Sequence, residues 1–248
     1  CEVNMGTAET TSKGEMFMYG MYGYGYGYGL DPTIILVLIG VALSLWAQGR
    51  VNSTFSRYSR VRSMTGMTAQ GIYDVTVQQI AGELTDHYDP RTKTVNLSQS
   101  VYGATSVAAI GVAAHECGHA MQDNEGYAPL RFRSALVPAA NFGSKLSWPL
   151  ILLGLVFGGL GSPLVEIGIL MFSLAVLFQL VTLPVEYNAS ARAVRLLDSQ
   201  GILAGEEVSG TRKVLNAAAH TYVAAAATSI LQLLRLIILF GGRNRRDN

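Results

Sequence analysis

Two histidines and a glutamate lie within five consecutive residues, HECGH, as His115, Glu116 and His119. On a helix, residues four apart share one face, so both imidazoles can direct a ring nitrogen at the same ion. Zinc accepts imidazole readily, and three protein ligands leave a fourth position for a water molecule whose pKa the ion lowers. Glu116 is then placed to take the proton from that water as general base. The motif therefore predicts a zinc site that activates water.

A third ligand has to come from elsewhere in the chain. Our choice is Glu186, which lies just past an apolar stretch, at the expected start of a helix. Two membrane crossings separate it from His119, so both residues end on the same side of the bilayer whatever the absolute orientation. Asp123, one turn beyond His119 on the same helical face, is the rival, and Glu125 is a weaker one. Glu166 should lie at the opposite membrane surface.

Peptide hydrolysis would also need a hydrogen-bond donor for the developing oxyanion and a surface on which the substrate lies. The sequence favours none of the candidates for the donor, which are His220, Tyr222, Tyr187 and Arg192. The segment TVNLS, upstream of the motif, alternates like a strand. It is either an ordinary edge strand or one that pairs with an extended peptide.

Composition points to lipid as a solvent for much of the chain. Half of the 248 residues are apolar and only 14% are charged, against the usual quarter. The formal net charge of +1, without a long basic run, argues against a nucleic-acid partner. Two cysteines exclude a disulfide framework. Cys117 lies inside the motif, where a thiol beside a metal would be easily oxidised, which favours a reducing, cytosol-facing site.

The elements that must position these residues follow from the polarity pattern. Residues 1–29 are polar and then alternate Tyr with Gly, which predicts a flexible tail. Residues 30–47 are nearly uncharged and just long enough to cross the hydrocarbon core as a helix. Four arginines follow between Arg50 and Arg62. By the positive-inside rule they place the end of this span in the cytoplasm.

Residues 48–137 are mixed in polarity and predict a cytosol-facing segment that carries the motif. Within it we expect a helix from Met67 to Leu84, introduced by Thr65 or Thr68. We also expect a β-hairpin in HYDPRTKTVNLS, with its turn at Asp89 and Pro90. The run that contains HECGH predicts a helix of about five turns.

The second half of the chain is mostly apolar. Residues 146–184 predict a transmembrane hairpin, because two apolar stretches flank a GGLGSP turn. Residues 185–216 should contain the second metal-ligand helix, which stops at Gly201. Residues 217–240 are apolar again and precede a basic tail, 241–248. A fourth crossing would place that tail outside, against the positive-inside rule, so the last apolar helix is either spanning or re-entrant.

Three features in this order, AAHECGHAMQ, the apolar hairpin and VEYNASARA, carry a family resemblance. Over roughly residues 30–240 the chain resembles the bacterial membrane zinc metallopeptidases of the YugP type. More distantly it is similar to the gluzincin peptidases of the HtpX kind. The resemblance implies a mainly α, polytopic helical membrane protein with a gluzincin-like zinc-peptidase segment and a small β-hairpin.

The resemblance also implies roles for single residues. His115, His119 and Glu186 match the zinc ligands, and Glu116 matches the catalytic acid and base. In the HtpX kind the second helix carries an aspartate four residues after the ligand, where it hydrogen-bonds a ligand histidine. Ser190 stands there in this chain. Serine can accept the same hydrogen bond but is uncharged, so it should tune the metal more weakly.

Together these patterns predict a membrane-embedded endopeptidase with Zn²⁺ as cofactor, in which a metal-activated water hydrolyses peptide bonds. The expected partners are a peptide or membrane-protein substrate and the lipid bilayer, with no nucleic acid. We expect a multi-pass protein of the cell membrane whose active site faces the cytoplasm. The alternative is a non-catalytic zinc-binding membrane protein, either a sensor or a structural site, although such a site has no need of Glu116.

Overall fold

The computed structural model describes residues 31–66, 75–83, 85–159 and 162–241. The tail predicted for residues 1–29 lies outside these residues, as does the basic tail beyond Gly241. The chain divides into two units between Ile34 and Ile35, and the second unit, from Ile35 onward, is compact. The second unit contains all the strands and, apart from the first residue of one helix, all the helices described below.

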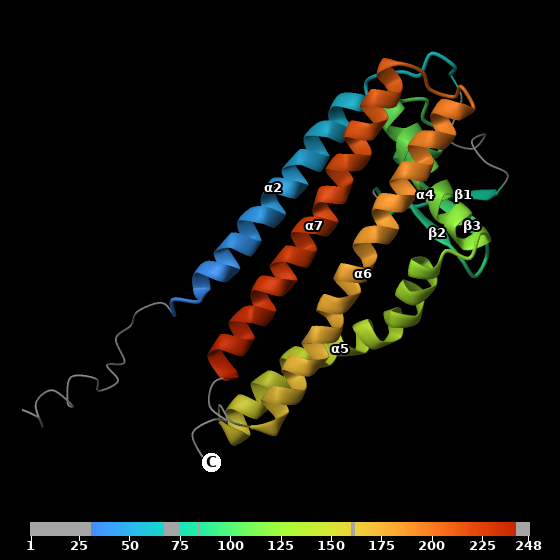
Figure 1. The fold of residues 1–248 in the computed structure, drawn as a ribbon. Coiled ribbons are helices and arrows are strands. Elements are labelled where there is room, and N and C mark those ends of the chain that lie inside the picture. The colour runs from blue at the N-terminus through green and yellow to red at the C-terminus, as the bar shows by residue number, and fades with distance from the viewer. Residues whose placement is uncertain (1–30, 67–74, 84, 160–161, 242–248) are drawn as a thin grey trace, which may run out of the picture. The chain divides into compact units, whose positions relative to one another are not determined.

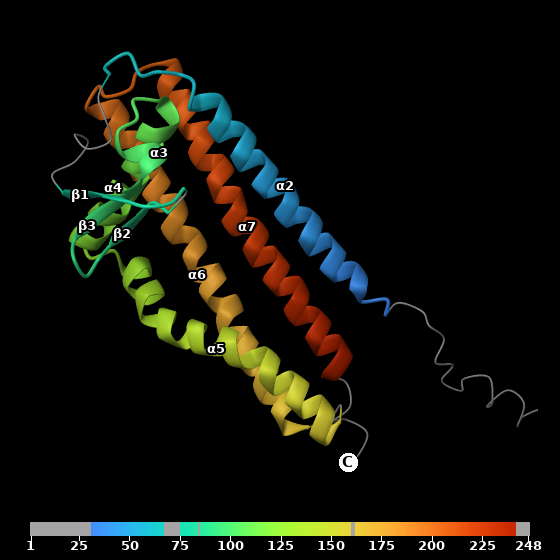
Figure 2. The ribbon, with the colours of Figure 1, turned by 180° about the vertical axis from the view of Figure 1, so that it is seen from behind.

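Four long helices dominate the part of the chain that the structure describes. They are α2 (Ile34–Tyr58), α5 (Ala128–Gly158), α6 (Pro163–Ser199) and α7 (Glu206–Phe240). Each is long and apolar enough to cross a membrane. In both views α7 lies between α2 and α6, and α5 packs along the N-terminal half of α6 (Figures 1 and 2). The prediction of a mainly α, polytopic membrane fold is thereby confirmed.

The helices extend well beyond the apolar stretches that predicted them. α5 begins at Ala128, and α6 continues through Pro184 as far as Ser199. Glu186 therefore lies within a long helix, and its predicted place at a helix start is wrong. Hydropathy marks only the part of a helix that faces lipid, while the hydrogen-bonded backbone continues into the polar region. Gly201, with a positive φ of 63°, follows the end of α6 as a glycine stop should.

Residues 217–240 belong to the single continuous helix α7, which begins at Glu206. α5, by contrast, bends away from α6 at its N-terminal end (Figure 2). Two prolines lie inside α5, Pro138 and Pro149, and proline removes a helix hydrogen bond and kinks the backbone. The bend carries the first turns of α5 toward α4 and the sheet (Figure 2).

A small sheet stands beside the C-terminal half of α6 (Figure 1). The predicted hairpin is present as β2 (His87–Asp89) and β3 (Thr94–Ser98), which pair antiparallel. A third strand, β1 (Thr76–Ile80), pairs parallel with β3. The helix predicted from Met67 to Leu84 is therefore wrong over Thr76–Ile80, because pairing with a distant strand overrides local helix propensity. Residues 67–74 lie outside the described residues.

The strand order β1-β3-β2 places β3 in the centre of the sheet. Both of its edges are occupied, so the TVNLS segment has no free edge for a peptide, and that interpretation is wrong. Its side chains Val95 and Leu97 are instead fully buried. The free edge that lies nearer the motif helix belongs to β2.

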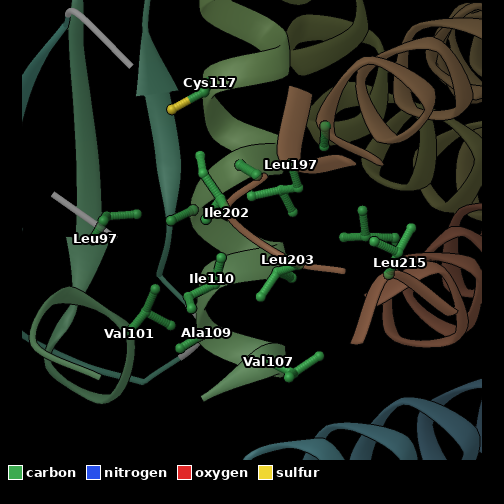
Figure 3. Packing of buried hydrophobic residues seen from close by; sticks show 14 of the residues in the cluster. Leu97, Val101, Val107, Ala109, Ile110, Cys117, Leu197, Ile202, Leu203 and Leu215 are labelled. Carbon is green, nitrogen blue, oxygen red and sulfur yellow. The ribbon is translucent and has the colours of Figure 1, made fainter. Parts of the chain in front are cut away.

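Helix α4 (Val107–Asn124) carries the HECGH motif between the sheet and the long helices. The Ser106 hydroxyl caps its N-terminus by accepting a hydrogen bond from the Ala109 amide at 3.2 Å. The short helix α3 (Gln99–Tyr102) precedes it. Small and branched apolar side chains of α4 join those of β3 and of the segment around Leu203 in one buried cluster (Figure 3). This core fixes α4 against α6 and α7.

Candidate metal centre

The crossing of α4 over α6 brings the two parts of the site together. A Cβ atom on Gly118 would lie 2.5 Å from the carbonyl oxygen of Ala189, well inside van der Waals contact. Glycine inside the HECGH motif therefore permits an approach of the two backbones that other residues would prevent. As a result, His115 and His119 on α4 face Glu186 and Ser190 on α6.

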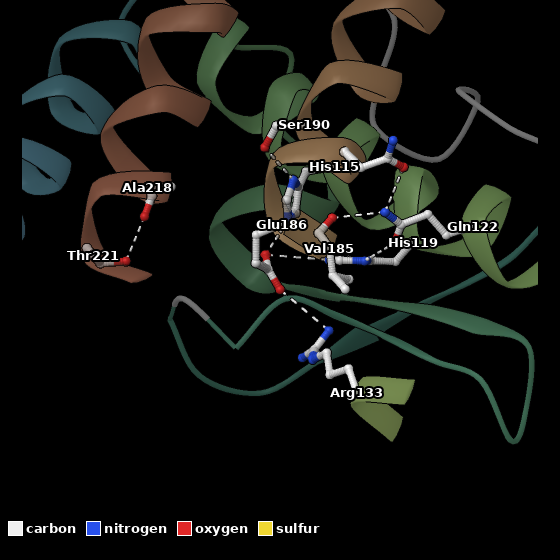
Figure 4. A network of polar contacts seen from close by, with 10 residues as sticks. His115, His119, Gln122, Arg133, Val185, Glu186, Ser190, Ala218 and Thr221 are labelled. Atoms are coloured by element: carbon white, nitrogen blue, oxygen red, sulfur yellow. Dashed lines mark hydrogen bonds and ion pairs between the residues drawn. The ribbon is translucent and has the colours of Figure 1, made fainter. Parts of the chain in front are cut away.

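Three donor groups converge at this crossing. One ligand atom from each of His115, His119 and Glu186 lies within 4.8 Å of the other two. The Glu186 carboxylate oxygen Oε2 is 3.2 Å from His115 Nε2 and 3.6 Å from His119 Nε2 (Figure 4). Glu186 is only 2% exposed, so its carboxylate faces the imidazoles and not bulk water.

The other ring nitrogen of each histidine is held by a polar side chain. His119 Nδ1 lies 2.9 Å from Gln122 Oε1, and the Gln122 amide nitrogen donates to the Val185 carbonyl at 2.9 Å. Because the Gln122 oxygen can only accept, His119 donates from Nδ1, which leaves Nε2 facing Glu186. His115 Nδ1 lies 3.1 Å from the Ser190 hydroxyl (Figure 4). Both rings therefore present Nε2 to the same point.

This arrangement fits a divalent cation such as zinc. Imidazole and carboxylate are zinc ligands, and ligand histidines usually have the second nitrogen hydrogen-bonded, as both do here. Burial lowers the pKa of His119, but the hydrogen bond with Glu186 and the charge of Glu116 raise it by more, so the net shift is upward. The surroundings of this imidazole thus favour a positive charge, which a metal ion can supply.

Glu116 lies between two cavities, each of about 270 Å³. One opens toward α2 and α7, and the other opens toward β2 and the first turns of α5. Both cavities are lined by Asp86, His115, Glu116, Glu186 and Tyr222. No described residue forms a hydrogen bond with the Glu116 side chain. Its carboxylate is therefore available to a water molecule or a substrate that enters from either side.

The rival ligands are engaged elsewhere. Asp123 accepts a hydrogen bond from the Tyr88 hydroxyl at 2.8 Å and pairs with Lys93. Burial raises the pKa of Asp123, but these two partners lower it by more, so the carboxylate serves to join α4 to the hairpin. Glu125 forms an ion pair with Arg192 at 2.7 Å, which lowers its pKa. Neither residue belongs to the metal-ligand cluster.

The four candidate oxyanion donors are dispersed. Tyr222 lines both cavities and lies close enough to Glu116 and Glu186 to interact with their charges. Arg192 is occupied by Glu125 and Asn188. Tyr187 is 45% exposed, and His220 packs on Trp46; neither lines the cavities around Glu116. The structure therefore brings only Tyr222 of these four to the site.

Two residues at the site were not singled out in the sequence. Gln122 lies three residues after His119, and that helical spacing could have indicated the contact. Arg133, near the start of α5, lies 3.5 Å from the second carboxylate oxygen of Glu186 (Figure 4). No local pattern points to Arg133, because the bend in α5 brings it there.

Cys117 belongs to the apolar cluster that α4 forms with the sheet (Figure 3). The residue is 2% exposed, and burial together with the charge of Glu116 raises the pKa of its thiol to about 12. A neutral buried thiol is neither a competing ligand nor easily oxidised. The argument for a reducing compartment from this cysteine therefore does not hold.

Comparisons with known proteins place the chain among zinc metallopeptidases by sequence. Residues 33–241 match the family described as "Putative neutral zinc metallopeptidase". The chain is 45% identical over 224 residues to the "Putative membrane protease YugP" of Bacillus subtilis (strain 168), a match that covers 86% of this chain and 98% of the relative. No solved structure matches the chain significantly. The family match spans the four long helices and the convergent histidines and glutamate, and the chain therefore belongs to this family of zinc metallopeptidases.

Proposed function

We propose that the protein is a membrane-embedded zinc endopeptidase that cleaves peptides or membrane-protein segments at the cytoplasmic surface. The observation that supports this most directly is the convergence of His115, His119 and Glu186 beside Glu116. A structural zinc site is usually enclosed by four protein ligands, whereas a catalytic site has three and keeps one position open. Three ligands next to two open cavities favour the catalytic arrangement.

Each side chain has a role that follows from its place. Zinc bound by the three ligands would supply a Lewis acid that lowers the pKa of a water molecule. Glu116, which no described residue engages, accepts the proton of the attacking water and passes it to the leaving amine. Tyr222 is the best placed of the candidate donors for the developing oxyanion. Gln122 holds His119 in the tautomer that a metal ligand needs, and Ser190 orients the ring of His115.

The edge strand β2 supports a peptide as the substrate. His87 and Tyr88 of this strand line the same cavity as Glu116 and Arg133. Since β3 occupies only one side of β2, the other edge can form backbone hydrogen bonds with an extended peptide. Such binding recognises backbone more than side chains, so we expect broad sequence preference.

The cytoplasmic orientation rests on charge. Nine Lys and Arg residues lie between the first two predicted spans, in the part of the sequence that carries the motif. A peptide added outside sealed membrane vesicles should therefore be cleaved in inside-out vesicles and left intact in right-side-out ones. Cleavage in right-side-out vesicles alone would reverse the orientation and leave the enzyme class intact.

The central experiment replaces Glu116 by Gln in the full-length protein in lipid nanodiscs. Gln keeps the shape but cannot take a proton, so we expect zinc content to stay at the wild-type level while peptide cleavage falls about 100-fold or more. Cleavage is measured by mass spectrometry of a peptide mixture, and zinc by elemental analysis. Glu206→Gln is the matched control, because Glu206 lies in the first turn of α7, away from both cavities.

Two outcomes would count against the proposal. If wild-type protein with its full zinc content cleaves no peptide, the site serves sensing or structure. If Glu116→Gln cleaves as fast as wild type, the general base is another group and the assigned mechanism is wrong.

A further inference from the structure

A further cavity of about 410 Å³ lies between α2 and α7, apart from the two cavities at the metal centre. We call it the basic groove. Arg50, Thr54 and Arg57 line it from α2, where their spacing of three and four residues places them on one helical face. Lys213 and Asn216 line it from α7 with the same kind of spacing. Two polar helix faces thus oppose each other across the groove.

The lining is rich in hydrogen-bond donors and carries uncompensated positive charge. Arg50, Arg57 and Lys213 contribute three permanent cations, and no carboxylate lines the groove. None of the three forms an ion pair with a carboxylate of the described residues. Cations that line one groove without a carboxylate partner favour the binding of an anion, and guanidinium groups suit phosphate oxygens especially well.

The groove lies where the lipid-facing surface ends. Just before Arg50 on α2, Leu45 is 69% exposed and Trp46 is 50% exposed. The Trp46 ring packs edge-on against His220 of α7 at 5.6 Å and lies 5.4 Å from the Arg50 guanidinium. Tryptophan favours the level of the lipid headgroups. The basic groove therefore begins at that level and extends toward the polar side.

We propose that the basic groove binds the phosphate of an anionic phospholipid headgroup. The cationic side chains hold the phosphate, and the exposed apolar surface of α2 below Trp46 accommodates the lipid tails. Basic pockets between transmembrane helices on the cytoplasmic side are suited to such headgroups. A soluble phosphate shares the same chemistry, but only a lipid uses both the cations and the adjacent apolar surface.

Trp46 serves as the reporter for the test. A Trp148→Phe variant removes the second tryptophan of the chain, and the protein is reconstituted in phosphatidylcholine with brominated phosphatidylglycerol or brominated phosphatidylcholine as quencher. We expect brominated phosphatidylglycerol to quench Trp46 fluorescence at a lower mole fraction than brominated phosphatidylcholine does. In the same background, Arg57→Gln with Lys213→Gln should reduce this preference about fivefold for each cation removed. Arg50 is retained because it lies against the reporter.

Two further variants make the test specific. Arg60→Gln with Arg62→Gln removes the same charge near the same end of α2, but neither residue lines the groove, so the preference should remain. Arg57→Lys with Lys213→Arg keeps the charge of the groove and should also retain the preference for phosphatidylglycerol. An equal loss in both charge-removing variants, or no preference in the wild type, overturns the proposal. Inorganic phosphate, but not chloride at equal ionic strength, should compete with this preference, because both phosphates use the same cations. If the wild type binds inorganic phosphate in the groove but shows no lipid preference, the phosphate site stands and the lipid is rejected as its source.

Discussion

Glu186 and Asp123 show how partners decide the role of a carboxylate. The sequence made both residues candidates for the third metal ligand. In the structure Glu186 faces two imidazoles, whereas Asp123 faces Lys93 and Tyr88. Loss of a residue that hydrogen-bonds a metal ligand typically lowers metal affinity roughly 10- to 100-fold. Glu186→Gln alters a ligand itself and should therefore lower zinc affinity by more than this. Asp123→Asn should leave it unchanged. Competition with a chelating dye measures both, and the reverse ranking would exchange the ligand assignment.

Gln122 acts on the metal only through His119. Its oxygen accepts from Nδ1, and its amide nitrogen is fixed by the Val185 carbonyl and the Asn188 side chain. Gln122→Ala leaves that imidazole free to turn, so zinc affinity should fall about 10- to 100-fold. Gln200→Ala, at the exposed end of α6, is the control. Equal affinities in the two variants would show that packing alone orients His119.

At the scale of elements, the site depends on how closely α4 crosses α6. Gly118→Ala would place a methyl group against the Ala189 carbonyl and force the helices apart. We expect a loss of about 1 to 3 kcal/mol in stability together with weaker zinc binding. Gly103→Ala is the matched control, since a Cβ atom there meets nothing within 4 Å and the φ of −99° suits any residue. Unfolding in detergent and zinc titration measure the two effects, and normal zinc binding by Gly118→Ala would contradict the argument.

At the scale of the molecule, a bound metal links segments far apart in the chain. His115 on α4 and Glu186 on α6 are separated in sequence by the whole of α5. Because the two residues meet only in the folded state, a metal ion bound by both stabilises that state and not the unfolded one. At free zinc 1,000 times above the dissociation constant, this linkage amounts to about 4 kcal/mol. Removal of zinc by a chelator should therefore lower the melting temperature of the wild type. A His115→Ala variant should melt at the same temperature with and without chelator; a chelator-induced shift in this variant would place the metal elsewhere.

The sequence predicted those features that local patterns encode. Apolar stretches indicated the membrane helices, the HECGH spacing placed both histidines on one helical face with Glu116 beside them, and Asp89 and Pro90 marked the hairpin turn. The strand at Thr76–Ile80 was missed because its partner, β3, is separated from it in sequence by β2, and single-sequence propensity carries no information about such pairing. The length of α6 was missed because hydropathy reports the environment of a helix and not its extent.

By itself, then, the sequence determined the class of chemistry and predicted that the HECGH motif and Glu186 lie on the same side of the membrane. Residue types fix which atoms can bind a metal, and the number of crossings fixes which ends of the helices meet. Only the tertiary structure decided that Glu186 and not Asp123 faces the imidazoles, that Cys117 points into the core, and that Arg133 reaches the site. These choices depend on the crossing of α4 over α6 and on the bend of α5, which arise from contacts between residues distant in the chain.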